Sequence, residues 1–206
     1  VRDLIEQFRV AADELVDKLL GNGSFDAVPD LAEVYPTTVF PKAVGLRETD
    51  ARRLIDYGSM VFNALGPDNE LRRSSMAKGP DIVPWITRAC ERDALDEGGI
   101  GHLIYEGVES GDVTAAEAGM LVRSLLSAGI DTTVTAIGSM LWCLATNPQA
   151  YATLRSEPGL SRHCFNEVLR FTSPVHSFCR TANLDTQVNG IKIVEGTKIL
   201  CVLGAA

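Results

Sequence analysis

The sequence predicts a mainly α-helical protein with a small β-sheet near its carboxy end. Apolar residues recur at helical spacing through most of the chain up to Thr172, whereas a period of two follows Pro174. From Thr114 to Thr146 the chain runs for about thirty residues without proline and is apolar around most of its circumference. This stretch predicts a long helix through the middle of the fold.

The composition is that of a globular protein and disfavours some functions. Hydrophobic residues make up 46% of the chain and charged residues 22%, which allows a sizeable core. A net charge of −8 disfavours nucleic-acid binding, because phosphates are bound by basic surfaces. Arg123 interrupts the most apolar stretch, so we expect no transmembrane helix and no membrane partner.

Helical periodicity and its interruptions define the elements of the first half. Gly21-Asn22-Gly23 ends the first helix. Between residues 25 and 46, three prolines leave room only for short helical pieces. Gly79-Pro80 and Pro84 predict a kink or a break in the third helix. The expected helices cover about residues 4–19, 50–65, 70–93 and 101–108.

Cap and turn signals define the second half. Thr114 and Glu117 form the capping-box pattern that begins the long helix. Asn147-Pro148 ends that helix and begins a short one. Asn189-Gly190 between two alternating segments predicts a β-hairpin. The elements expected here are a helix over about 160–172 and strands over 186–189, 191–194 and 198–203.

The cysteines predict reduced thiols in a cytoplasmic protein. They are odd in number and scattered, and they lack any Cys-x-x-Cys or Cys/His cluster, so neither a zinc site nor a disulfide framework is expected. The five are Cys90, Cys143, Cys164, Cys179 and Cys201.

Polar residues interrupt the apolar surface of the long helix. Ser124, Ser127 and Asp131 share one stripe of the helix, and buried polar groups need partners. One interpretation is structural: the serines bond to preceding carbonyls, Asp131 forms an ion pair, and Gly129 permits close helix packing. The other is catalytic: an acid that reaches solvent, beside the alcohol of Thr132, delivers protons into a dry site.

A second motif follows in the helix near residue 165. Glu167 and Arg170 are three residues apart and are therefore neighbours on a helix surface. Taken alone, this spacing is typical of a solvated surface ion pair that contributes little.

The two motifs, in this order, resemble the oxygen-activating helix and the Glu-x-x-Arg helix of cytochrome P450 haem-thiolate monooxygenases. The resemblance rests on the runs Ala128–Thr133 and Glu167–Arg170. It implies a partial P450 fold with haem b as cofactor, against which the long helix packs at Ala128 and Gly129. Asp131 then relays protons and Thr132 holds the bound oxygen. A threonine hydroxyl bonded one turn back would open the helix locally.

The resemblance also assigns residues after the long helix. Glu167 and Arg170 become a buried network beneath the haem, and Arg180 binds a haem propionate, for which a guanidinium is well suited. The alternative for Arg180 is a surface arginine at a strand edge. Val175 and Phe178 lie in the stretch that lines the substrate pocket.

The chain is expected to be an internal portion, residues 1–206, of one P450 domain. The loop of form Phe-x-x-Gly-x-x-x-Cys-x-Gly, which supplies the thiolate of the haem iron, is not in the sequence, and no cysteine here has that context. No metal ligand is therefore expected within this chain, and residues 1–206 alone are expected to be inactive.

More narrowly, the chain resembles soluble bacterial monooxygenases that oxidise para-substituted benzoic acids by hydroxylation or O-demethylation. This implies O2 and a ferredoxin-type iron–sulfur electron donor as partners. The residues that would recognise the carboxylate are Arg123, Ser124 and Ser127, and those that would hold the aromatic ring are Phe62, Leu65, Val175 and Phe178. The alternative is a non-catalytic helical protein that binds a small acid or a partner; the acid–alcohol pair favours the enzyme.

Overall fold

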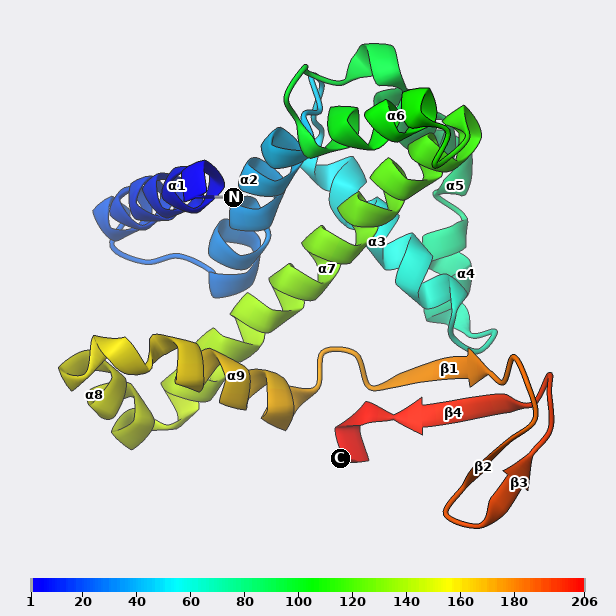
Figure 1. The fold of residues 1–206 in the computed structure, drawn as a ribbon. Helices are drawn as coiled ribbons and strands as arrows, with labels where there is room; N and C mark the ends of the chain where they lie inside the picture. The colour runs from blue at the N-terminus through cyan, green and yellow to red at the C-terminus, as the bar shows by residue number, and fades with distance from the viewer. Residues whose placement is uncertain (1, 206) are drawn as a thin grey trace. The chain divides into compact units, whose positions relative to one another are not determined.

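The computed structural model describes residues 2–205, and the side chains of residues 4–205. The chain forms two compact units, Val1–Gly138 and Ser139–Ala206, and their elements are labelled in Figure 1. The helices are α1 (Arg2–Gly21), α2 (Val34–Val44), α3 (Ala51–Ala64), α4 (Glu70–Met76), α5 (Gly79–Ala89), α6 (Ile100–Ser110), α7 (Ala115–Thr146), α8 (Pro148–Ser156) and α9 (Ser161–Thr172). The strands are β1 (Ser177–Thr181), β2 (Thr186–Val188), β3 (Ile191–Ile193) and β4 (Lys198–Val202).

The proline-containing segment after α1 is more helical than expected. A short π-helix (Ala27–Ala32) leads into the eleven-residue helix α2, which contains both Pro36 and Pro41. Pro36 lies in the first turn, where a backbone N–H has no helical acceptor and proline is tolerated. Pro41 removes one backbone bond near the end of α2, and Gly45 then closes the helix in the left-handed conformation (φ 93°).

The expected break in the third helix is present. α4 ends at Met76 and α5 begins at Gly79, with Pro80 in its first turn. Pro84 lies within α5 and does not end it. The second expected helix is confirmed as α3, whose N-cap Asp50 accepts a hydrogen bond from the Arg53 amide at 3.0 Å.

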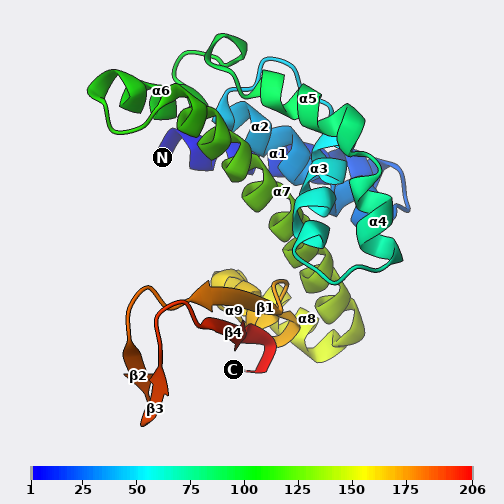
Figure 2. The same ribbon diagram turned by 90° about the vertical axis from the view of Figure 1, so that its right-hand side faces the viewer.

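The first half of α7 runs through the core of the Val1–Gly138 unit. The capping box is formed: the Thr114 amide donates to Glu117 at 2.8 Å, and the Glu117 amide donates to the Thr114 hydroxyl at 3.3 Å. Leu126 and Ile130 of α7 are almost completely buried in a cluster with side chains of α3, α5 and α6. Figures 1 and 2 both show α3 beside α7.

The Ser139–Ala206 unit contains two short antiparallel ladders rather than one sheet. β2 and β3 form the expected hairpin, with Asn189 and Gly190 at φ 49° and 82°, as a type I′ turn requires. β1 pairs with β4, so that Ser177 lies opposite Val202. The alternation after Pro174 indicated extended chain, but the pairing of β1 with β4 had no signal in the sequence.

By length and composition α7 passes the criteria for a membrane-spanning helix, although none was expected because of Arg123. The central helix of a globular protein satisfies the same criteria. The five cysteines are free thiols. Among the residues that the structure describes, no three His, Cys, Asp or Glu side chains are grouped to hold a metal ion.

Candidate active site

The middle of α7 carries the acid and the hydroxyls of the first motif. The Thr132 hydroxyl donates to the Ala128 carbonyl at 2.6 Å, and the Thr133 hydroxyl donates to the Gly129 carbonyl at 2.7 Å. The expected bond one turn back is therefore present at both threonines. The helix is not opened by it, because α7 is α-helical without interruption from Ala115 to Thr146. A side-chain bond of this kind shares a carbonyl with the backbone without breaking the ladder.

Asp131 is a half-buried carboxylate on α7. Burial raises its pKa above the ordinary aspartate value, and no nearby charge or hydrogen bond contributes to that shift. Its side chain lies against Gly58 of α3. A carboxyl group in these surroundings is protonated at higher pH than usual, which suits a group that passes protons inward.

Gly129 lies against the ring of Phe40 from α2. A Cβ atom added at residue 129 would be 2.3 Å from two carbons of that ring, so any residue other than glycine would displace the ring. Close helix packing was one of the two interpretations of this glycine, and the structure shows it. The resemblance implied that α7 packs against the haem at Gly129, whereas in this structure Gly129 contacts Phe40.

The polar residues one to two turns before Asp131 have different surroundings from one another. Ser127 is buried, donates to the Ser124 carbonyl at 3.1 Å and lies beside Tyr57 of α3. Burial raises the pKa of Tyr57, and Arg123 and the Ser127 hydroxyl oppose that rise. Ser124 is exposed. The two serine hydroxyls therefore do not converge on one point in this structure.

Arg123 is directed toward α5. Its guanidinium donates to the Thr87 hydroxyl at 3.4 Å, and it lines a cavity of about 410 Å³ with residues of α5, α6 and the start of α7. The structure therefore does not bring Arg123 together with Ser127 as a shared carboxylate clamp.

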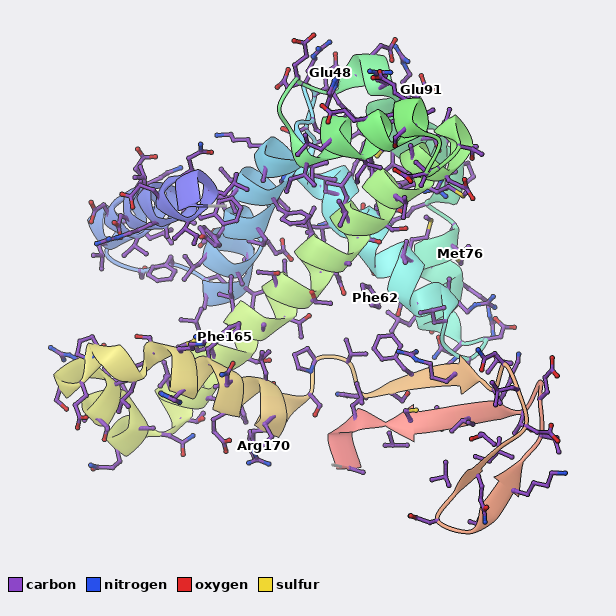
Figure 3. The ribbon with its side chains drawn as sticks, viewed as in Figure 1. Glu48, Phe62, Met76, Glu91, Phe165 and Arg170 are labelled. Carbon is purple, nitrogen blue, oxygen red and sulfur yellow. The ribbon has the colours of Figure 1, made fainter. Side chains whose placement is uncertain are left out.

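The second motif forms a bidentate ion pair. Arg170 donates from Nε and Nη2 to the two carboxylate oxygens of Glu167, at 2.8 and 2.7 Å, and this contact lowers the pKa of Glu167. Burial was expected from the resemblance, but the side chains are 61% and 63% exposed because no described residue covers this face of α9. Figure 3 labels Arg170 on α9.

The remaining candidates lie at the end of α3 and around β1. Phe62 is half-buried in the last turn of α3 (Figure 3), and Leu65, just after the helix, is 76% exposed. Val175 is half-buried before β1. Arg180 on β1 lies over the ring of Phe178, with its guanidinium carbon 5.2 Å from the ring centroid.

Phe40 and Gly58 were missed by sequence reasoning, yet they contact the two central residues of the motif. Each lies on a different helix, and only the fold brings them to Gly129 and Asp131. The glycine in the middle of α3 was the available signal, since glycine inside a helix is costly and usually has a packing reason.

A family model described as Cytochrome P450 matches residues 39–158, more than half of the chain. Cytochrome p450 CYP199A2 from Rhodopseudomonas palustris is 44% identical over 207 residues, which cover 100% of this chain and 50% of the relative. The chain belongs to the cytochrome P450 family. Cytochrome P450 107B1 from Saccharopolyspora erythraea is 29% identical over 100% of this chain and 50% of its own length. The chain thus spans about half the length of these curated P450 relatives.

Solved structures show the same fold. P450BioI in complex with an acyl-carrier protein that bears hexadec-9Z-enoic acid superposes with a TM-score of 0.82 at 21% identity, over 99% of this chain and 55% of that one. Cytochrome P450 CREJ in complex with (4-ethylphenyl) dihydrogen phosphate gives 0.83 at 23% identity, over 99% and 52%. The mainly α-helical P450 fold with a long central helix is therefore confirmed.

P450 proteins bind haem, and one stripe of α7 fits a flat macrocycle. Ala128 and Thr135 are exposed and Thr132 is half-buried, whereas Leu126 and Ile130 are buried in the core. The exposed stripe carries only small side chains, whose hydroxyls already have helical acceptors. Burial raises the pKa of the Cys90 thiol to about 12, so this thiol is protonated at neutral pH in the structure described here.

Proposed function

We propose that the full-length protein containing this chain is a cytoplasmic haem-thiolate monooxygenase that inserts one oxygen atom from O2 into a small aromatic acid. The observation that carries the proposal is the pairing of a half-buried Asp131 with the Thr132 hydroxyl on a stripe of small, uncovered side chains. Bound haem would supply the binding and reductive activation of O2.

The residues of this chain would hold the haem and move protons. Ala128 and Thr132 lie on the stripe that would face the haem, and Gly129 would keep α7 close to α2 behind it. Asp131 would take protons from solvent and pass them toward the Thr132 hydroxyl, which would hold water and oxygen in place. Arg180 would pair with a haem propionate.

The Glu167–Arg170 pair would support the haem from below. Its bidentate geometry is already formed, so the pair is preorganised for a covered position in the full-length protein. A third partner for the pair would then come from outside the residues described here.

The substrate would be a para-substituted benzoate, oxidised by hydroxylation or O-demethylation. Support comes from the resemblance of the whole chain and from the buried hydroxyl of Ser127, one turn before Asp131. Phe62, Leu65, Val175 and Phe178 would hold the ring, and a ferredoxin-type iron–sulfur protein would supply electrons.

The proton relay is tested by substitutions in the full-length enzyme. Thr132→Ala should keep substrate binding but divert electrons to hydrogen peroxide, and Asp131→Asn should slow turnover by roughly 10²-fold, the scale for a lost proton donor. Thr133→Ala is the matched control, because Thr133 makes the same bond to the preceding turn. Product and peroxide formed per NADH are measured. Parental rate and coupling in both variants would contradict the relay.

The substrate class is tested separately by binding. Ser127→Ala should weaken binding of 4-methoxybenzoate more than binding of its uncharged amide, by about 1.5–3 kcal/mol for a lost bond to a charged group. Spectral titration of the haem measures both dissociation constants. Equal losses for acid and amide would mean that Ser127 does not contact the carboxylate.

A further inference from the structure

The middle of α3 lies unusually close to the acid of α7. A Cβ atom added at Gly58 would be 2.9 Å from the Asp131 Cβ, 3.5 Å from its Oδ1 and 3.6 Å from its Cγ. Gly58 is buried. Contacts below 3.0 Å are not tolerated between carbon atoms, so no other residue fits at 58 without a movement of α3 or of Asp131.

A second contact holds α3 against α7 about two turns before Asp131. Tyr57, the residue before Gly58, is 5% exposed and its hydroxyl donates to the Arg123 carbonyl at 3.5 Å. The Tyr57 side chain and the Gly58 backbone thus contact α7 at points about two turns apart. Together they fix how far α3 stands from α7 where the carboxylate lies.

We propose that Gly58 is a positioning residue for Asp131, and that its missing side chain sets the place and the burial of the carboxylate from which protons are delivered. The role of Asp131 in that delivery is the function proposed above. The contact between Gly58 and Asp131 is observed in the structure and does not depend on that proposed function.

Charged neighbours do not account for the surroundings of Asp131. On α3, Asp56 pairs with Arg52 and with Lys78, which follows α4. On α7, Arg123 donates to Thr87. Lys42, on α2, is exposed. Burial is the cause of the raised Asp131 pKa, and α3 provides part of that burial through the contact at Gly58.

The proposal predicts the effect of a single methyl group. In the full-length holoenzyme, Gly58→Ala should separate α3 from α7 at this point and admit water to the carboxylate. The titration midpoint of Asp131 should then fall toward the ordinary aspartate value. Enzyme labelled with ¹³C at the aspartate carboxyl carbon, with Asp131→Asn to assign the signal, gives that midpoint by NMR without turnover.

Gly138→Ala is the matched control. It adds the same methyl group to α7 itself, where the nearest atom is the Val28 Cγ2 at an ordinary 3.8 Å. The Asp131 midpoint should be unchanged there. If the titration midpoint of Asp131 in Gly58→Ala equals that of the parent enzyme, the proposal is overturned.

A failure of Gly58→Ala to fold is also informative. If the contact with Asp131 is the cause, Asp131→Gly in the same chain removes the clashing Cβ and should restore folding. A double variant no more stable than Gly58→Ala would overturn the proposal. If Asp131→Asn leaves turnover unchanged, the proton relay is wrong, but the measured midpoint still decides the role of Gly58.

Discussion

The two compact units of the chain differ in how their apolar side chains are used. In Val1–Gly138, side chains from α3, α5, α6 and α7 form one buried cluster. Among the described residues of Ser139–Ala206, Val168 is the one buried apolar side chain. There the side chains of α7, α8 and α9 line a groove of about 570 Å³ instead, and Phe171 is 65% exposed.

The two units therefore differ in which interactions stabilise their structure. The first unit is held by burial, which contributes about 25 cal/mol for each Å² of apolar surface removed from water. The second unit is held by local features: a proline in the first turn of α8, an ion pair within α9 and a glycine turn between β2 and β3. Local features specify elements but contribute little to global stability.

The largest expected effect concerns burial. Leu126→Ala should lower the free energy of unfolding by about 2–5 kcal/mol, because the side chain is fully buried in the cluster. Leu154→Ala, the same change at a half-buried position of the exposed helix α8, should cost less than half as much. Urea unfolding of the full-length protein measures both. Equal losses would show that residues 139–206 gain a second packed layer in that protein.

A smaller and local effect is expected in the hairpin. Gly190 has φ 82°, and a β-branched residue in the left-handed region costs about 1–2 kcal/mol. Gly190→Val should therefore speed amide exchange in β2 and β3 without changing the global melting temperature. Gly159→Val is the control, since a side chain there meets open space at ordinary φ. A fall in global melting temperature for Gly190→Val would mean that the hairpin is part of the cooperative core.

The smallest expected effect reports on Asp131. Because burial raises its pKa in the folded state, stability is lost as the pH rises through that pKa. Asp131→Asn should therefore melt at a higher temperature than the parent at pH 7, and the gain should vanish below pH 3.8, the ordinary aspartate value. Asp13→Asn, on an exposed face of α1, serves as control. An equal gain at both pH values would mean that ionisation is not the cause.

The sequence was sufficient where structure is decided locally. The capping box at Thr114, the Asn189-Gly190 hairpin and the break between α4 and α5 each depend on residues a few positions apart, and each is confirmed. The length of α7 followed from the absence of proline between Thr114 and Asn147.

The sequence was insufficient to predict features that depend on contacts between distant segments of the chain. Pro41 is inside α2 because burial of that helix outweighs one lost backbone bond. The pairing of β1 with β4 joins segments about twenty residues apart, and the turn signal between them, Asn189-Gly190, belongs to the β2–β3 hairpin. For the candidate site, the acid and the hydroxyls were readable from the motif, but the helices that contact them were not.

The contact between Phe40 and Gly129 has a consequence for how this protein can change during evolution. A side chain at 129 would overlap the outer end of the Phe40 ring, so it requires either that the ring turn away or that residue 40 become smaller. The path through a smaller residue 40 is open, because it first leaves a void that a new residue 129 can fill. Among relatives of this chain, a larger residue at the position of Gly129 should therefore occur more often with a small residue than with phenylalanine at the position of Phe40.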